Sequence, residues 1–381
     1  MPNLKGFDPP FSFYAVFAFL LGLIFGSFLN VVIHRVPRGE SIVFPGSHCG
    51  ACRAPIRPFD NIPLLSFALL GGRCRACRAR IPFSYPLVEL GAGLIFVAIV
   101  FKTGPSIEAL FEFAFACVMI ALAFIDARHQ LLPNAITYPA FLFAGVAAAA
   151  RAALSAPQEP PSLIQDVSIL FPGVQPEFTA WRAAIIGGFL LAAAAPGFWL
   201  LDRLDPLLFG KYFDREEEDA GNAGAAGNTG QASSPLTIRL TMAVGVIVAA
   251  AWATLIVFLS PGHQPAFEEA YGGLLNAGAG ALISGGLVWC VRTLYFFIRG
   301  FEGMGLGDIK MMSIVGAFQG FSGALSVLTL GSVLGAITGL ILIYRSGRGG
   351  LEFKSRLPFG AYLGAAALII MVLPFFNFAK P

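Results

Sequence analysis

Long apolar runs alternate with short polar segments along almost the whole chain. From Phe11 to Ile33 there is no charged residue, and a run of that length can cross roughly 30 Å of bilayer hydrocarbon as an α-helix. Similar runs cover residues 85–101, 107–125, 136–150, 184–201, 238–260, 272–298, 309–321, 323–344 and 359–376. The pattern predicts an all-α fold, a polytopic membrane helix bundle with about ten spans. The run at 309–321 is short, so we expect its N-terminal part to line a water-filled cavity.

The composition supports the same interpretation. Of the 381 residues, 56% are hydrophobic and only 12% are charged, whereas about 25% of the residues in a soluble domain are charged. This excludes a soluble enzyme and a nucleic-acid-binding protein, and it makes the lipid bilayer an expected partner. The N-terminal flank contains one Lys and one Asp, and no Ala-x-Ala cleavage signal follows the first run. We therefore expect that run to be retained as an uncleaved anchor.

The distribution of charge predicts an orientation. Between the first and second runs there are two acidic residues, Glu40 and Asp60, and eight arginines: Arg35, Arg38, Arg53, Arg57, Arg73, Arg75, Arg78 and Arg80. Positive charge is concentrated in the cytoplasmic loops of membrane proteins, so this loop is predicted to be cytoplasmic and the N-terminus outside. Alternation through all the spans also places inside a second basic loop, which contains Arg345, Arg348, Lys354 and Arg356.

Four of the six cysteines form two pairs in the first basic loop, Cys49-x2-Cys52 and Cys74-x2-Cys77. Two pairs at this spacing can place four thiolates around one tetrahedral zinc ion. A closed site of this kind has no open coordination position, so the zinc is predicted to be structural. Two disulfides are the alternative, although a cytoplasmic loop faces a reducing environment. His48 is a competing ligand that we interpret as a bystander.

Two carboxylates at the edges of predicted spans are the candidates for chemistry. Asp126 closes the third run, and Asp308 opens the eighth after three glycines, Gly303, Gly305 and Gly307. Ionisable residues in such places are costly and are functional candidates by default. Two Asp side chains from separate helices can share a proton, one acting as base toward water while the other protonates the substrate carbonyl. In the alternative interpretation, each Asp caps a helix or pairs with Arg128 or Lys310.

The order of these motifs is similar to that of a known family. The motifs are GSFLNVVIHRVP at 26–37, the two cysteine pairs, YPLVEL at 85–90, the Asp126 segment with Pro133 and Asn134, and GMGLGDIK at 303–310. The chain resembles the prepilin peptidases, type IV leader peptidases that cleave prepilins and N-methylate the new terminus. The resemblance covers roughly residues 22–150 and 275–381. It implies that Asp126 and Asp308 are the catalytic pair of a Gly-x-Gly-Asp intramembrane aspartic protease, with S-adenosylmethionine as methyl donor.

The expected organisation follows from the spans and this resemblance. We expect a first span at 11–33, a cytoplasmic zinc module at 34–84, a membrane core at 85–150, an insertion at 151–273 and a second core at 274–381. The insertion departs from the family pattern, because it contains two extra spans and an acidic, then Gly/Ala/Ser-rich linker at 214–235 that is predicted to be disordered. An even number of added crossings keeps everything downstream on the same side.

The resemblance implies an enzyme of the bacterial inner membrane that acts on prepilins or pseudopilins at the cytoplasmic face. Two alternatives stay open: a peptidase without methyltransferase activity, and a proton-coupled transporter. The spacing does not assign the residues for methyl transfer; Glu89 and the basic loop are candidates only.

Substrate contacts are predicted near the Gly-x-Gly-Asp motif. The three glycines give the backbone freedom to approach an extended peptide closely. Glu302 is the candidate for receiving a basic leader, and Lys310 is a further candidate for substrate contact or loop shaping. Other charged side chains in the spans are interpreted as structural: Glu108 and Glu112 reach interfacial water, and Arg292 extends to the cytoplasmic boundary.

Overall fold

The computed structural model describes residues 11–154, 264–299, 304–345 and 358–373. Its α-helices are α1 (Phe11–Arg35), α2 (Leu65–Leu69), α3 (Ser84–Thr103), α4 (Ile107–His129), α5 (Asn134–Leu154), α9 (Gln264–Arg299), α10 (Leu306–Arg345) and α11 (Phe359–Val372). Two 3-10 helices, η1 (Val36–Arg38) and η2 (Pro58–Asn61), lie between α1 and α2. Within the described residues the only β structure is two isolated bridges, His48 to Pro55 and Arg73 to Arg80. The predicted all-α class is confirmed for this part of the chain.

Most of the predicted spans correspond to helices. Six described helices are long and apolar enough to cross a membrane: α1, α3, α4, α5, α9 and α10. Helix α11 is apolar as well but has only 14 residues. The runs predicted at 184–201 and 238–260, and the linker predicted at 214–235, lie outside the described residues. The count of ten spans is therefore not confirmed.

The runs predicted separately at 309–321 and 323–344 are joined in one element, α10. The element contains a break at Gly320, whose backbone is not helical (φ 76°, ψ 175°). Glycine adopts a positive φ without the steric penalty that a Cβ would bring. The kink therefore occurs at a glycine, the residue type that best accommodates this backbone conformation.

The chain divides into two compact units. The first comprises residues 1–133 and 327–380, and the second comprises residues 134–326. Helix α10 contributes to both, because its residues up to Ser326 belong to the second unit and those from Val327 belong to the first.

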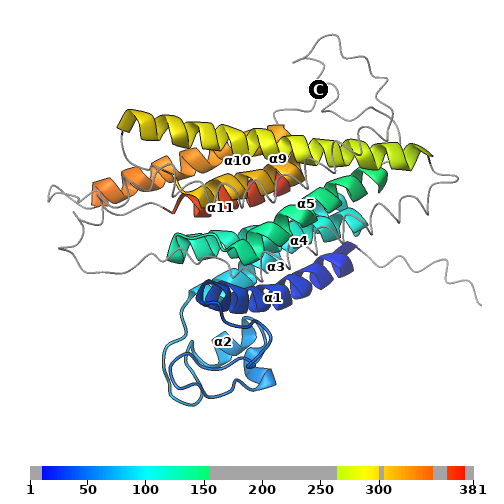
Figure 1. The fold of residues 1–381 in the computed structure, drawn as a ribbon. Coiled ribbons are helices and arrows are strands. Elements are labelled where there is room, and N and C mark those ends of the chain that lie inside the picture. The colour runs from blue at the N-terminus through cyan, green and yellow to red at the C-terminus, as the bar shows by residue number, and fades with distance from the viewer. Residues whose placement is uncertain (1–10, 155–263, 300–303, 346–357, 374–381) are drawn as a thin grey trace, which may run out of the picture. The chain divides into compact units, whose positions relative to one another are not determined.

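In the first unit, α1 packs along α3, α4 packs on both of them, and α11 packs mainly on α4 (Figure 1). The closest approach is at glycines of α1. A Cβ at Gly22 would lie 2.7 Å from the carbonyl oxygen of Ala92, and a Cβ at Gly26 would lie 2.6 Å from Cα of Glu89. Small residues allow such backbone contact between membrane helices. The GSFLNVVIHRVP segment thus begins at a helix-packing position.

In the second unit, α5 packs on α9, and the first part of α10 also packs on α9. Ser284 of α9 donates a hydrogen bond to the carbonyl oxygen of Met312 at 3.0 Å. Gly280 and Gly316 face each other so closely that neither has room for a Cβ. This contact fixes the helix that begins with the Gly-x-Gly-Asp motif against its neighbour.

Candidate active site and tetracysteine centre

The loop between α1 and α3, residues 36–83, brings the four predicted cysteines together; we call it the cysteine module. Both pairs form the same turn. The amide of Cys49 donates to the carbonyl of Ala54 at 2.9 Å, and the amide of Cys74 donates to that of Ala79 at 2.9 Å. The sequence Cys-x-Ala-Cys-Arg-Ala occurs in both pairs, so a repeated local sequence builds a repeated local structure.

The four sulfur atoms have the spacing that a zinc ion requires. They all lie within 4.8 Å of one another, and the Sγ atoms of Cys49 and Cys77 are 3.9 Å apart. Four thiolates about 2.3 Å from a tetrahedral zinc ion would be separated by about 3.8 Å. A disulfide needs about 2.05 Å, and all four cysteines are free. The donor set therefore fits one zinc ion better than two disulfides, while His48 only contacts the carbonyl of Gly46.

The local environment also favours a thiolate. Hydrogen bonds from the backbone amides of Cys52 and Ala51 lower the pKa of the Cys49 thiol to about 6. The amide of Ala79 acts on Cys77 in the same direction, but the neighbouring thiols and burial outweigh it and raise the pKa of Cys77 to about 11. Negative charge is thus concentrated first on one sulfur of a crowded group, which is the situation that a bound cation relieves.

Two membrane helices hold the cysteine module. Glu89, buried in α3, accepts a hydrogen bond from the amide of Leu64 at 2.8 Å. Arg35, buried at the end of α1, donates to the carbonyls of Ser41 at 3.0 Å and Gly46 at 3.1 Å. Glu89, which the sequence indicates as a candidate for methyl transfer, therefore contacts the cysteine module directly.

Asp126 lies near the C-terminal end of α4 and is only 6% exposed. Its Oδ2 accepts a hydrogen bond from the amide of Ala361, in the first turn of α11, at 2.9 Å. Amides in the first turn of a helix have no partner one turn earlier and attract negative charge. The alternative pairing with Arg128 is not formed, because that guanidinium donates to the hydroxyl of Ser84.

Asp308 lies in the first turn of α10 and is 7% exposed. Its Oδ2 accepts a hydrogen bond from the amide of Gly305 at 3.2 Å. A carboxylate that reaches back to the start of its own helix forms half of a capping box, so the capping interpretation is correct for this contact. Asp126 belongs to the first unit and Asp308 to the second.

The other residues predicted near Asp308 have different outcomes. Gly303 and Glu302 lie outside the described residues. Gly305 and Gly307 are described, and neither has a positive φ. Lys310 is buried at 7% exposure, and its ammonium donates to Oδ1 of Asn134 at 2.9 Å.

One interpretation of the charged side chains in the spans is wrong, that of Glu112, and Arg292 makes a contact within the protein. Glu112 is 3% exposed, and its Oε1 accepts a hydrogen bond from Lys102 at 2.6 Å. Lys102 also donates to the carbonyl of Met371, so the pair ties α3 and α4 to the end of α11. Arg292 is 3% exposed, and its Nε donates to the carbonyl of Met304 at 3.1 Å. Arg292 therefore supports the segment just before Asp308, a role that its position late in an apolar run did not indicate.

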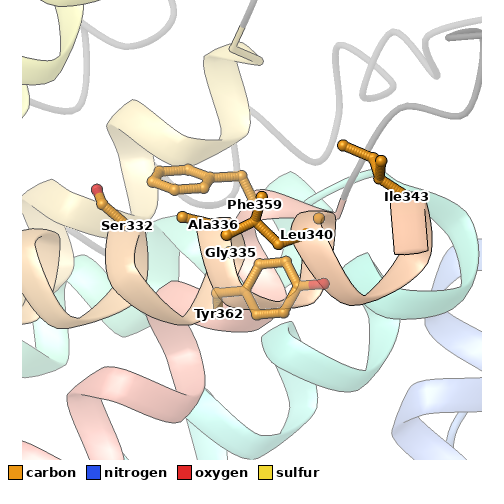
Figure 2. Close-up of a pocket in the computed structure, with 8 residues that line it drawn as sticks. Ser332, Gly335, Ala336, Leu340, Ile343, Phe359 and Tyr362 are labelled. Atoms are coloured by element: carbon orange, nitrogen blue, oxygen red, sulfur yellow. The ribbon is translucent and has the colours of Figure 1, made fainter. Parts of the chain in front are cut away.

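An apolar groove of about 470 Å³ lies in the first unit, between the second half of α10 and the first turn of α11 (Figure 2). Phe359 and Tyr362 line it from α11, near the amide that contacts Asp126. The α10 side is lined largely by small residues, among them Ser332, Gly335, Ala336 and Gly339. The lining includes no carboxylate, thiol or imidazole, so we assign the groove no catalytic role.

Comparison with known proteins gives a family match and several relatives. Residues 20–103 match the bacterial peptidase A24 N-terminal domain. A prepilin leader peptidase/N-methyltransferase from Myxococcus xanthus (strain DK1622) is 46% identical over 147 residues, which are 39% of this chain and 43% of that protein. Proteins of the same name from Burkholderia pseudomallei (strain 1026b) and Pseudomonas putida are both 25% identical, over 96% and 95% of this chain and 88% and 91% of theirs. No solved structure matches the chain.

The matches complement one another. The domain match spans most of α1, the cysteine module and α3. The match at 46% identity covers less than half of the Myxococcus protein, whereas the Burkholderia and Pseudomonas proteins align along nearly the whole chain. The resemblance drawn from the motifs is confirmed: this chain is similar to proteins named prepilin leader peptidase/N-methyltransferase.

Proposed function

We propose that the chain is a membrane aspartic endopeptidase that cleaves the leader of prepilins or pseudopilins at the cytoplasmic membrane face. We propose further that it then methylates the new N-terminus with S-adenosylmethionine. The predicted class, an enzyme of the prepilin peptidase type, is confirmed by the relatives. The finer proposal is carried by one observation: Asp126 and Asp308 are both buried acids that accept a backbone amide at a helix N-terminus.

In the proposed reaction the two aspartates divide one proton between them. The ionised carboxylate takes a proton from water, whose oxygen attacks the carbonyl carbon of the scissile peptide bond. The protonated carboxyl gives its proton to the carbonyl oxygen. When the tetrahedral intermediate collapses, the carbon–nitrogen bond breaks and the carboxyl that took the proton from water gives it to the departing amine. The other carboxylate takes a proton from a hydroxyl of the intermediate, which restores the starting state of the pair. A helix N-terminal amide supports the ionised form of each carboxylate.

We assign the other predicted groups to supporting roles. Cys49, Cys52, Cys74 and Cys77 would hold one structural zinc ion, which would fix the cysteine module above Glu89. Glu302 is proposed to receive the basic leader, with the glycines of the motif leaving space for an extended peptide. Methyl transfer is proposed for the whole chain, without assigned residues.

The test is the pair of substitutions Asp126→Asn and Asp308→Asn, in full-length protein reconstituted in lipid. Each should lower prepilin cleavage by at least roughly a thousandfold, because the proton shuttle is lost. Methylation of an already cleaved pilin should continue, which also shows that the variant is folded. Asp60→Asn, in the cysteine module, is the matched control and should cleave normally.

Wild-type cleavage by either Asn variant would remove that residue from the mechanism. If the wild-type protein cleaves prepilin but methylates nothing in the presence of S-adenosylmethionine, the chain is a peptidase without methyltransferase activity.

A further inference from the structure

A polar contact joins the helix that carries Asp308 to the beginning of α5. The Nζ of Lys310 donates to Oδ1 of Asn134 at 2.9 Å, between residues 176 positions apart in the sequence. The same Nζ lies 5.6 Å from the ring centroid of Tyr138. Asn134 and Tyr138 are separated by four positions, so they share one face of α5. We call Lys310 and these two partners the lysine clamp.

Two of the three clamp residues are buried, and Asn134 is partly exposed. Lys310 is 7% exposed and Tyr138 is 8% exposed. An ammonium group removed from water is unfavourable unless polar groups replace its hydration. The amide oxygen of Asn134 and the electron-rich face of Tyr138 both do so. A methionine would fill a similar volume without that requirement, so packing alone does not explain a lysine at this position.

The direction of Lys310 is coupled to that of Asp308. The two residues are two positions apart near the start of α10, and successive residues of an α-helix turn by about 100°. Their side chains therefore leave the helix on different sides. When α5 holds Lys310, the rotation of this turn about the helix axis is fixed, and so is the direction of the Asp308 carboxylate. The contact from Asp308 to Gly305 restrains the turn only from within.

We propose that Lys310 is a positioning residue for Asp308, acting through Asn134 and Tyr138. The proposal rests on the proposed function, in which Asp308 takes part in cleavage. It gives the buried lysine of the GDIK segment a role that does not require contact with substrate.

The test compares Lys310→Met, Asn134→Leu and the double variant in full-length protein in lipid nanodiscs. For each, kcat and KM for prepilin cleavage are measured, together with the rate of methylation of an already cleaved pilin. Lys310→Met should lower kcat of cleavage roughly 10- to 100-fold, the loss expected when a catalytic group moves by about 1 Å. The KM and the methylation rate should stay at the wild-type values. The double variant should be no slower than Lys310→Met, because both changes remove one contact.

A matched control is Lys102→Met, which removes the lysine that contacts Glu112 in the first unit. It should reduce cleavage and methylation in parallel, as general destabilisation does. A wild-type kcat in Lys310→Met, a parallel fall in methylation, or additive losses in the double variant would each overturn the clamp. If Asp308→Asn is inactive while Lys310→Met cleaves prepilin with the wild-type kcat, the role of the lysine clamp is refuted and the proposed function is not. If Asp308→Asn cleaves, the proposed function fails with it.

Discussion

A backbone amide contacts each of the two candidate carboxylates. Asp126 accepts from the amide of Ala361, and Asp308 accepts from the amide of Gly305. A guanidinium partner would bind an ionised carboxylate tightly and oppose its protonation. A neutral amide attracts the ionised form less strongly, so the same group can still accept a proton. This is the behaviour that an acid-base pair requires.

The cysteine module should depend on zinc for its fold. Its three short helices bury a single residue, Ser66, so a hydrophobic core does not hold it. Removal of the metal with a strong chelator, or Cys52→Ser, should release about one zinc ion per chain and open the arginine-rich loop to trypsin. Metal analysis and mass spectrometry of the fragments provide the measurement.

Cys117→Ser is the control for this prediction, because Cys117 lies in α4 outside the cluster. It should keep both the zinc and the resistance to trypsin. A metal-free wild-type module that still resists trypsin would show that the loop folds without the ion.

At the scale of the element, glycines of α1 allow its backbone to pack directly against the backbone of α3. Gly26→Ala places a Cβ 2.6 Å from a backbone atom of Glu89, and backbone cannot move aside as a flexible side chain can. Overpacking of this kind destabilises by about 1–3 kcal/mol. Thermal unfolding of the purified protein should therefore occur at a lower temperature in this variant.

Gly91→Ala provides the comparison within the same helix pair, because a Cβ at Gly91 meets no atom within 4 Å. Alanine favours helix over glycine by up to about 1 kcal/mol, so the unfolding temperature should stay the same or rise. Equal losses in both variants would mean that the α1–α3 contact is looser than described.

The sequence predicts the described helices well because an apolar run long enough to span a bilayer has few other stable structures. The run at 107–125 corresponds to α4, and that at 359–376 begins where α11 does. The predicted division of α10 lies within two residues of the break in the structure. A lone polar residue, Ser322, separates the two runs, and a serine does not by itself end a helix. The kink is instead at Gly320.

At the scale of the whole molecule, the motifs identify Asp126 and Asp308 but not their surroundings. The contacts of Asp126 with Ala361 and of Lys310 with Asn134 join positions 235 and 176 residues apart. Apolar periodicity predicts that a segment forms a helix, but it does not predict which other helices pack against that helix. The contact of Arg292 could not be predicted for the same reason, since its partner Met304 lies beyond the end of its own helix.

The connectivity of the first unit predicts a topology. The cysteine module lies between the end of α1 and the beginning of α3, and α4 returns after a three-residue turn, 104–106. If α1, α3 and α4 each cross the membrane once, Asp126 is on the side of the module. A cysteine introduced at Pro105 should then react with a membrane-impermeant thiol reagent in intact cells. Glu40→Cys should react only after the membrane is opened.

Both positions are exposed, and the wild-type chain gives the background from its six cysteines. Reaction of Glu40→Cys in intact cells would place the module outside and reverse the predicted orientation.

The hydrogen bond between Asp126 and Ala361 also bears on the order in which this part of the protein forms during translation. A ribosome adds about 5–20 residues per second, so the 235 positions between the two residues correspond to roughly 10–50 s of synthesis. During that interval α1, the cysteine module, α3 and α4 already exist, but the amide that Asp126 accepts has not been made. In the nascent chain, Asp126 therefore lacks this hydrogen-bond donor until α11, the last described helix, has been translated. A messenger truncated before α11 would yield a protein with the cysteine module and the first helices, in which Asp126 lacks the amide of Ala361.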